Sequence, residues 1–378
     1  MKFIHLSDLH IGKRVNDFSL IEDQKYILRQ ILKITDREKP DAVLIAGDVY
    51  DKTVPTAEAV ELLDSFLSRL SERNLSVFII SGNHDSPERL AFGSSIMSRG
   101  GIHFSRVYNG EVEKYLLEDE YGTVNIFMLP FIKPSNVRRF YQEEEIGSYT
   151  QAVAVALKDI KLDNGQRNII MTHQFVTGAR RSDSEEISVG GSDNVDAAVF
   201  DGFDYVALGH IHGPQSMRKP TVRYCGTPLK YSFSEAGHKK SVTVVTLAEK
   251  LNVQIDTIEL VPLRDMRNIK GTYMEIADRN NYIKTNTNDY IHITLTDEED
   301  VPDAIGRLRS IYPNIMKLDY DNARTRTAGE FLRPQQAESK SPARLFADFY
   351  FMQNNRQMSD DAGCFVHELI EKIWEGKV

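Results

Sequence analysis

The chain has 378 residues, and at ~100 to 200 residues per domain this length predicts two or three domains. Hydrophobic residues make up 41% and charged residues 27%, which excludes disordered and fibrous classes and favours a soluble enzyme or binding protein. The formal charge of -9 disfavours nucleic acid binding by the surface as a whole, because affinity for a polyanion comes largely from Lys and Arg.

Short apolar runs rich in β-branched residues fill the first two-thirds of the chain and predict buried strands. They are Lys2–Ser7, Ala42–Ala46, Ser76–Ser81, Asn125–Leu129, Asn168–Thr172, Tyr205–Leu208 and Ser241–Leu247. Between them, Ile21–Ile34 and Ala57–Leu70 carry apolar residues at three- and four-residue spacing, which predicts amphipathic helices. This order predicts an α/β domain over residues 1–260, with a sheet between helices.

Beyond residue 260 the pattern changes. Gly271–Ile276, Tyr290–Thr296 and Ile315–Tyr320 are typical of strands and Val301–Ile311 of a helix, which predicts a small α+β domain over residues 261–333.

The last part, residues 334–378, begins with a polar linker, Pro334–Pro342. An apolar cluster follows, made of Leu345, Phe346, Phe349, Tyr350, Phe351 and Met352. Ser359 is placed to cap a final helix whose apolar face holds Phe365, Val366, Leu369, Ile370, Ile373 and Trp374. Since the linker separates this segment from the preceding domain, we favour a surface that docks on a partner over a self-packed helix.

Two features bear on the compartment. Cys225 and Cys364 are too few for a disulfide framework or a multi-thiolate zinc site, which favours a reducing cytoplasm. The sequence has no uncharged apolar run of ~18 residues, so we expect no transmembrane helix.

Five polar motifs lie at or just after predicted strand ends, where α/β sheets place their ligand sites. They are Asp8-Leu9-His10, Gly47-Asp48, Gly82-Asn83-His84-Asp85, Thr172-His173 and Gly209-His210-Ile211-His212. Each is weak alone, since a single strand-end histidine is more often a structural hydrogen-bonding residue. Together, in this order, they predict one functional site.

The predicted donor set has two carboxylates, an amide oxygen and several imidazoles. This mixture suits Mn²⁺, Fe²⁺ or Zn²⁺ better than Ca²⁺ or a thiolate zinc site. Two such ions would leave the site positive and attract a phosphodiester despite the acidic chain. Gly47 and Gly209 would let the backbone turn tightly beside the ions.

The five motifs resemble the calcineurin-like metallophosphoesterase pattern over about Met1–Leu247. Within that superfamily the chain is most similar to the SbcD family of nuclease subunits. Three stretches carry the narrower likeness: Ile4–Gly12 (IHLSDLHIG), His173–Gly191, and Tyr224–Val242 (YCGTPLKYSFSEAGHKKSV). The resemblance implies a sandwich of sheets flanked by helices, with a capping domain after residue 260.

The resemblance also implies a role for each site residue. One Mn²⁺ ion would be held by Asp8, His10, Asp48 and His212, and the other by Asp48, Asn83, His173 and His210. Asp48 would bridge the two ions, His84 would act as a catalyst that binds no metal, and Asp85 would orient His84. The implied activity is a 3′ to 5′ double-strand exonuclease and a single-strand or hairpin endonuclease in DNA repair and recombination.

The partners implied are DNA and an SbcC-type ATPase, in a heterotetramer that contains a homodimer of this chain. The sequence has no Gly-x-x-x-x-Gly-Lys-Ser/Thr loop, so any ATP dependence would come from the ATPase. Two alternatives stay open, a small-nucleotide phosphodiesterase of the same superfamily and a non-catalytic scaffold. A protein phosphatase is disfavoured, because those enzymes carry Asp-Arg-Gly where this chain has Asp48-Val-Tyr.

Other polar residues have simpler interpretations. His5, His103, His238, His292 and His367 lack ligand-like neighbours and are left out of the site. The basic pairs Arg138-Arg139, Arg180-Arg181, Lys239-Lys240 and Arg324 with Arg326 are candidate phosphate contacts as a group, although most charge pairs are solvated surface.

Overall fold

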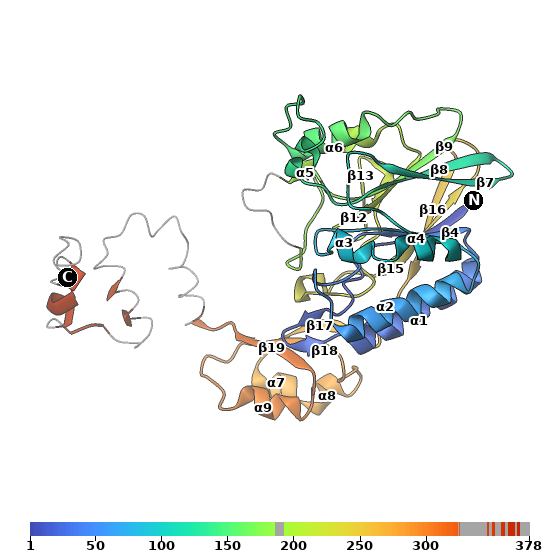
Figure 1. Cartoon of the computed structure of the whole chain (residues 1–378). Helices are drawn as coiled ribbons and strands as arrows, with labels where there is room; N and C mark the ends of the chain where they lie inside the picture. Colours follow the sequence, from blue (N-terminus) through green and yellow to red (C-terminus); the bar gives the residue numbers. More distant parts are fainter. Residues whose placement is uncertain are drawn as a thin grey trace. The chain divides into compact units, whose positions relative to one another are not determined.

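The computed structural model describes residues 1–185, 193–323 and 325, and short stretches at 346–347, 350–351, 357–359, 362–366 and 369–370 (Figure 1). The chain forms two compact units, Met1–Arg267 and Asn268–Val378, each described here by itself. The expected linker at 334–342 lies outside the described residues, as do Arg324, Arg326, Leu345, Phe349, Met352, Ile373 and Trp374.

Two six-stranded sheets build the first unit. The first sheet has the order β16-β15-β1-β4-β5-β6 and the second has the order β13-β14-β12-β9-β8-β7. The strands of the first sheet are β1 (Lys2–Leu6), β4 (Ala42–Ala46), β5 (Ser76–Ile80), β6 (Ile102–Phe104), β15 (Ser241–Leu247) and β16 (Val253–Glu259). Those of the second are β7 (Glu113–Asp119), β8 (Gly122–Leu129), β9 (Arg167–His173), β12 (Tyr205–Gly209), β13 (Gln215–Met217) and β14 (Lys219–Tyr224). Two short ribbons pair β2 (Arg14–Val15) with β3 (Phe18–Ser19) and β10 (Phe175–Val176) with β11 (Asn194–Val195).

The two sheets share a buried apolar core. Phe3, Leu44 and Phe78 of the first sheet belong to the same buried cluster as Ile126 and Ile169 of the second. Strands β1, β4, β5 and β6 are parallel to one another, as are β8, β9, β12 and β14. The expected sandwich of sheets is confirmed, and parallel pairing brings the carboxyl ends of its central strands to one edge of each sheet.

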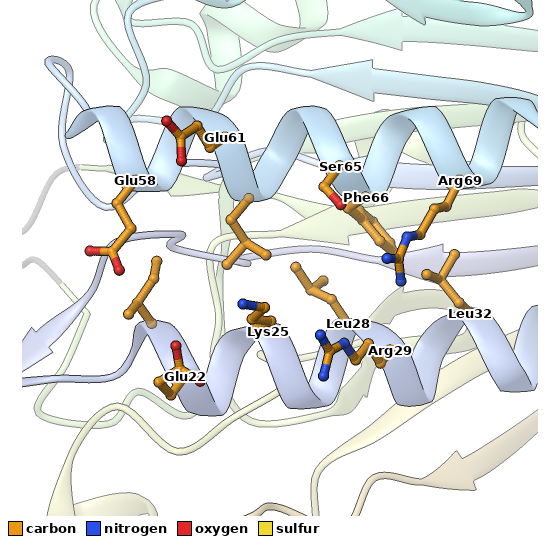
Figure 2. A pocket seen from close by; sticks show the side chains of 12 residues that line it. Glu22, Lys25, Leu28, Arg29, Leu32, Glu58, Glu61, Ser65, Phe66 and Arg69 are labelled. Carbon is orange, nitrogen blue, oxygen red and sulfur yellow. The ribbon is translucent and has the colours of Figure 1, made fainter.

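Helices α1 (Ile21–Glu38) and α2 (Ala57–Ser71) run side by side in the first unit (Figure 2). Thr56 caps α2 by accepting a hydrogen bond from the Ala59 N–H, which satisfies one of the free donors at the helix start. A groove of about 300 Å³ separates the two helices, with Leu28 and Phe66 among its apolar lining and charged side chains such as Glu58 around it (Figure 2). No predicted site residue lines this groove.

The remaining helices of the first unit are short. They are α3 (Pro87–Leu90), α4 (Ser94–Met97), α5 (Pro134–Arg138) and α6 (Tyr149–Leu157), with 3-10 turns at Ser98–Gly100, Ala197–Phe200 and Phe233–Glu235. Ser148 and Gln151 form a capping box at the start of α6. Val153 of α6 belongs to a second buried cluster, together with Phe127 and Val206 of the second sheet.

In the second unit, β18 (Tyr290–Leu295) and β19 (Ile315–Tyr320) are parallel strands of a three-stranded sheet of order β17-β18-β19, in which β17 is Met266–Gly271. Helices α7 (Tyr273–Ala277), α8 (Arg279–Tyr282) and α9 (Ala304–Arg309) accompany it. The expected strand at Gly271–Ile276 is wrong. The strand ends at Gly271, and Thr272 and Glu275 form a capping box that starts α7 instead.

At the carboxyl end, the Ser359 hydroxyl accepts a hydrogen bond from the Ala362 N–H at 3.4 Å, as an N-cap does. The side chains of Phe346, Phe351, Phe365 and Leu369 are exposed. Among the described helices of both units, none combines the length and the apolar character needed to cross a bilayer.

Candidate metal centre

The five polar motifs meet at the carboxyl ends of five parallel strands. Asp8 follows β1, Asp48 follows β4 and Asn83 follows β5, while His173 ends β9 and the two histidines after Gly209 follow β12. Backbone hydrogen bonds join these turns, from the Asp8 N–H to the Gly47 carbonyl and from the His10 N–H to the Asp48 carbonyl, both at 2.9 Å. All seven side chains predicted as metal ligands are thereby brought into one buried region.

Four of these residues have backbone conformations that side chains seldom adopt. The φ angles are +52° at Asp8, +43° at His10, +48° at Asp48 and +102° at His210. Positive φ costs a residue with a side chain of order 1–3 kcal/mol and persists where the surroundings hold it in place, commonly at functional sites. The turns are therefore strained in a way that fixes where the ligands point.

Two turns of the site need glycine because neighbouring atoms lie too close for a side chain: Gly209 lies against Ala46, and Gly82 lies against Asp48. A Cβ added at Gly209 would lie 1.8 Å from the Ala46 carbonyl oxygen, and one at Gly82 would lie 2.0 Å from Asp48 Oδ1. These distances are far below contact, so any side chain would push the two sheets or the two turns apart. The two glycines thus allow the close approach that brings the donor atoms together.

The donor atoms form overlapping groups. Asp8, His10 and His212 offer ligand atoms within 4.8 Å of one another, and so do Asp8, Asp48 and His173. His10 Nε2 lies 3.3 Å from His212 Nε2.

Asn83 joins the second group. Its Oδ1 lies 3.0 Å from His173 Nε2 and 2.9 Å from His210 Nδ1. His173 Nε2 also lies 3.3 Å from Asp48 Oδ2. Carboxylate, amide and imidazole atoms therefore converge on the same space.

Hydrogen bonds on the far side of two imidazole rings decide which nitrogen faces the site. His173 Nδ1 donates to the Ala46 carbonyl at 2.8 Å, so Nε2 is the ring nitrogen that faces Asp48. Ser184 donates its hydroxyl proton to Glu235 at 2.5 Å, so its oxygen accepts from His212 Nδ1 at 2.7 Å. His212 Nε2 therefore presents a lone pair to the site.

The protonation states of the clustered side chains favour binding of a cation among them. Burial holds the pKa of His10 well below its usual value and lowers the pKa of His210 to about 3, so both rings are neutral and able to bind a metal. His173 differs, because Asp48 outweighs its burial and raises its pKa to about 9. A proton between His173 and Asp48 is what a metal ion would replace, and the donor set fits divalent metals.

Asp85 differs from the expectation that it orients His84. Its carboxylate accepts hydrogen bonds from the N–H groups of Val49 at 3.1 Å, Tyr50 at 2.9 Å and Gly82 at 2.9 Å. Burial and the charge of Asp48 raise its pKa to about 6. Asp85 thus ties the turn after β4 to the turn after β5, and its side chain is turned to the backbone rather than to the imidazole.

His84 lies at the more open side of the centre. Its Nδ1 donates to the Asp51 carbonyl at 3.1 Å, and its Nε2 lies 4.0 Å from Asp48 Oδ2. The side chain is 16% exposed, whereas that of His173 is 0% exposed. The Asp51 carbonyl therefore takes the orienting role expected of Asp85. His84 also forms a third group of donor atoms within 4.8 Å of one another, with His10 and Asp48.

Sequence reasoning missed Glu235 as a support of His212, and its interpretation of Lys240 as a candidate phosphate contact is wrong, because Lys240 is buried against Glu235. Glu235 and Lys240 are buried, and the Lys240 ammonium lies 2.5 Å from Glu235 Oε2 and 2.9 Å from the His212 carbonyl oxygen. Burial disfavours the charge on Glu235, but the hydrogen bond with His212 and the Lys240 charge hold its pKa below the ordinary value. Both residues lie inside the stretch Tyr224–Val242, so the likeness of that stretch was the available signal.

Three of the histidines left out of the site have other partners. His5 Nδ1 bonds the Tyr205 hydroxyl at 2.8 Å in the core between the sheets, and burial lowers its pKa to about 3. His103 stacks on Phe78, and His292 pairs with Asp319 in the second unit.

Comparison with known proteins extends over both parts of the chain. Residues 1–214 match the family described as Calcineurin-like phosphoesterase, and residues 262–354 match the Type 5 capsule protein repressor C-terminal domain. The SbcD subunit of the SbcCD nuclease of Staphylococcus epidermidis is 36% identical over 322 residues, which cover 84% of this chain and 85% of that protein. Among solved structures, a dimetal phosphatase from Danio rerio gives a TM-score of 0.41 at 12% identity, covering 69% of this chain and 99% of the other. The TT1561 protein of Thermus thermophilus gives 0.36 at 12% identity, with 68% and 98% covered.

Proposed function

Because the chain belongs to the SbcD family of calcineurin-like phosphoesterases, we propose that it hydrolyses DNA phosphodiesters with two Mn²⁺ ions per subunit. As a member of this family, the chain is a metal-dependent phosphoesterase and a nuclease subunit. The observation that carries the proposal is the convergence of oxygen atoms from Asp48 and Asn83 on His173 Nε2, at 3.3 and 3.0 Å, beside the His10–His212 pair. The proton that His173 holds between these oxygens is what a bound metal ion would replace.

The proposed ligand sets divide the seven side chains between two ions. Asp8, His10, Asp48 and His212 hold one ion, and Asp48, Asn83, His173 and His210 hold the other. Asp48 is the shared ligand, since its Oδ2 faces His173 Nε2 at 3.3 Å and His10 Nε2 at 3.6 Å. When bound, a pair of divalent ions supplies water activation at neutral pH and neutralises charge that develops on the phosphoryl oxygens.

His84 is the proposed catalyst that binds no metal. Its Nδ1 proton is held by the Asp51 carbonyl, so the second nitrogen is the one that can carry a proton to the leaving oxygen. Asp85 keeps the turns that bear Asp48 and Asn83 in place and has no direct part in proton transfer.

Family membership supports a finer proposal about the activity. We propose 3′ to 5′ exonuclease action on duplex DNA and endonuclease action on single strands and hairpins, in DNA repair and recombination. The place of action is the cytoplasm, where the chromosome of a bacterium lies.

One experiment separates this proposal from a small-nucleotide phosphodiesterase and from a scaffold. The purified chain, with and without an SbcC-type ATPase, is given labelled duplex and hairpin DNA, bis-p-nitrophenyl phosphate and cyclic nucleotides, with Mn²⁺ or with a chelator. We expect Mn²⁺-dependent loss of 3′ ends from DNA. Cleavage of cyclic nucleotides with DNA left intact would support the phosphodiesterase instead, and inactivity on every substrate would support the scaffold.

The proposed partner is an SbcC-type ATPase that docks on residues 345–378. Four apolar side chains described in this segment, those of Phe346, Phe351, Phe365 and Leu369, are exposed. Deleting residues 345–378 is expected to abolish co-purification with the ATPase, because the apolar contacts are lost, while cleavage of bis-p-nitrophenyl phosphate stays within about twofold. Normal stoichiometry of the truncated chain with the ATPase would exclude this docking site.

A homodimer of the chain within a heterotetramer is the proposed assembly. Val60 and Leu67 of α2 line one apolar pocket together with Leu90, Phe92 and Met97, and Phe92 is 83% exposed. Isolated surface apolar residues are common, but a lined apolar hollow on the surface is typical of an interface.

Phe92→Glu is expected to raise the dimer dissociation constant by about 100-fold or more, because it replaces a large apolar contact with a charge that must lose its water on association. Light scattering coupled to gel filtration measures the change. Met274→Glu, at a side chain that is 74% exposed on α7, is the matched control and should leave the molar mass unchanged. A dimer that survives Phe92→Glu places the interface elsewhere.

A further inference from the structure

A second pocket borders the candidate metal centre. It has a volume of about 670 Å³ and is lined by three segments: Gly178 to Arg181 after β10, Gly213 to Met217 after His212, and His238 with Lys239. Gly213 directly follows His212, and Lys239 precedes Lys240, whose ammonium donates to the His212 carbonyl at 2.9 Å. The pocket and the centre therefore share a wall.

The charge of this pocket is opposite to that of the chain. Arg180, Arg181 and Lys239 line it, and no carboxylate belongs to the described residues of its lining, although the whole chain carries a charge of -9. Arg181 pairs with Asp193 at 2.8 Å. Within residues 1–185 and 193–323, the side-chain charges of Arg180 and Lys239 have no ion-pair partner. Among the residues that the structure describes, these two cations are therefore available to bind an anion.

The walls of the pocket are fixed by hydrogen bonds. Gln215 accepts from the Arg180 N–H at 3.0 Å and donates to the Arg180 carbonyl at 2.9 Å, which ties two of the three segments together. The Arg181 guanidinium lies 3.5 Å from the centre of the Phe175 ring, and that ring lies 6.3 Å from the ring of His210. The cationic wall is therefore held in a set position beside a proposed metal ligand.

We propose that this basic pocket binds a backbone phosphate of the DNA strand next to the phosphate that is cut. The inference rests on the proposed nuclease function and deepens it, because it assigns a subsite for a second phosphate. A small diester has only one phosphate and cannot fill this subsite. Arg180 and Lys239 would each neutralise strand charge and release counterions. The pocket would then favour polynucleotides over small diesters, without reading base sequence.

The test uses the full chain with Arg180→Ala and Lys239→Ala combined. DNA affinity of a single strand is measured with a chelator present, as a function of salt, and cleavage of DNA and of bis-p-nitrophenyl phosphate is measured with Mn²⁺. We expect about tenfold weaker DNA binding and a salt slope smaller by about 1.4, from ~0.7 for each single-strand contact. Cleavage of the small diester should stay within about twofold.

The matched control is Arg218→Ala with Lys219→Ala, which removes two cations at the turn between β13 and β14, where both pair with Asp201 outside the pocket. If both double variants weaken DNA binding equally, the loss reflects net charge alone and the proposed subsite is overturned. If the parent chain cuts DNA and the variant with Arg180→Ala and Lys239→Ala keeps the parent's salt slope, the proposed subsite is also overturned. If the parent chain binds DNA through Arg180 and Lys239 yet never cuts it, the nuclease proposal fails while the phosphate site stands. A parent that neither binds nor cuts DNA overturns both.

Discussion

Replacing Asp48 with asparagine is expected to lower DNA cleavage by at least about 10⁴-fold, which corresponds to ~5 kcal/mol of barrier. Asp48 belongs to two groups of donor atoms, one with Asp8 and His173 and one with His10 and His84. Its Oδ1 accepts a hydrogen bond from the His84 N–H at 2.9 Å. Without the carboxylate, the proposed shared ligand is gone and both ions are bound weakly. Cleavage rates and metal content by mass spectrometry measure the loss together.

Asparagine is the informative substitution, because Asp48 has a φ of +48° and asparagine tolerates this conformation where alanine does not. A loss of rate in Asp48→Asn therefore reports chemistry rather than a broken turn. Asp36→Asn, at an exposed residue that pairs with Arg73 on the surface, is the matched control and should retain full activity. Normal metal content and activity in Asp48→Asn would rule out the two-ion centre.

His84→Ala is expected to lower DNA cleavage by ~10²- to 10⁴-fold while metal content and DNA affinity stay nearly unchanged. The reason is that the ring is partly exposed, is held by the Asp51 carbonyl and lies 4.0 Å from Asp48, beyond direct bonding distance. His210→Ala is the contrasting variant, because it removes a proposed ligand and should lower metal content as well as rate. Thermal melting of both variants shows whether either one merely unfolds.

If His84→Ala protein stays active, or fails only because it has lost metal, then His84 has no catalytic role. If instead its melting temperature falls and its rate on folded protein is normal, the histidine is structural.

Strands whose two faces are both buried could be predicted from sequence, whereas edge strands could not. The strands Ala42–Ala46 and Ser241–Leu247 were predicted with the observed bounds, since the first is a continuous apolar run and the second is rich in β-branched residues. Strand β7, Glu113–Asp119, alternates between half-buried and exposed positions and contains three acids, so it resembled a loop. Its pairing with β8 comes from the sandwich, which a local pattern does not reveal.

The proposed metal ligands could be predicted from the sequence better than the residues that hold them in place. Every residue predicted as a ligand lies in the centre, because parallel strands bring their carboxyl ends together whatever the distance along the chain. Asp85 and Glu235 show what could not be predicted. The first is adjacent to His84 in sequence yet binds the backbone of the preceding turn, and the second approaches His212 from a 3-10 turn in a later segment. Contacts of this kind depend on how distant loops fold back, which neighbouring residues do not encode.

We propose that the seven ligand side chains form one centre for two divalent metal ions. Anomalous scattering from crystals soaked in Mn²⁺ tests it directly. We expect two peaks in each chain, one among Asp8, His10 and His212 and one among Asn83, His173 and His210, with Asp48 between them. A single peak, or peaks at other residues with none in this cluster, would contradict the account.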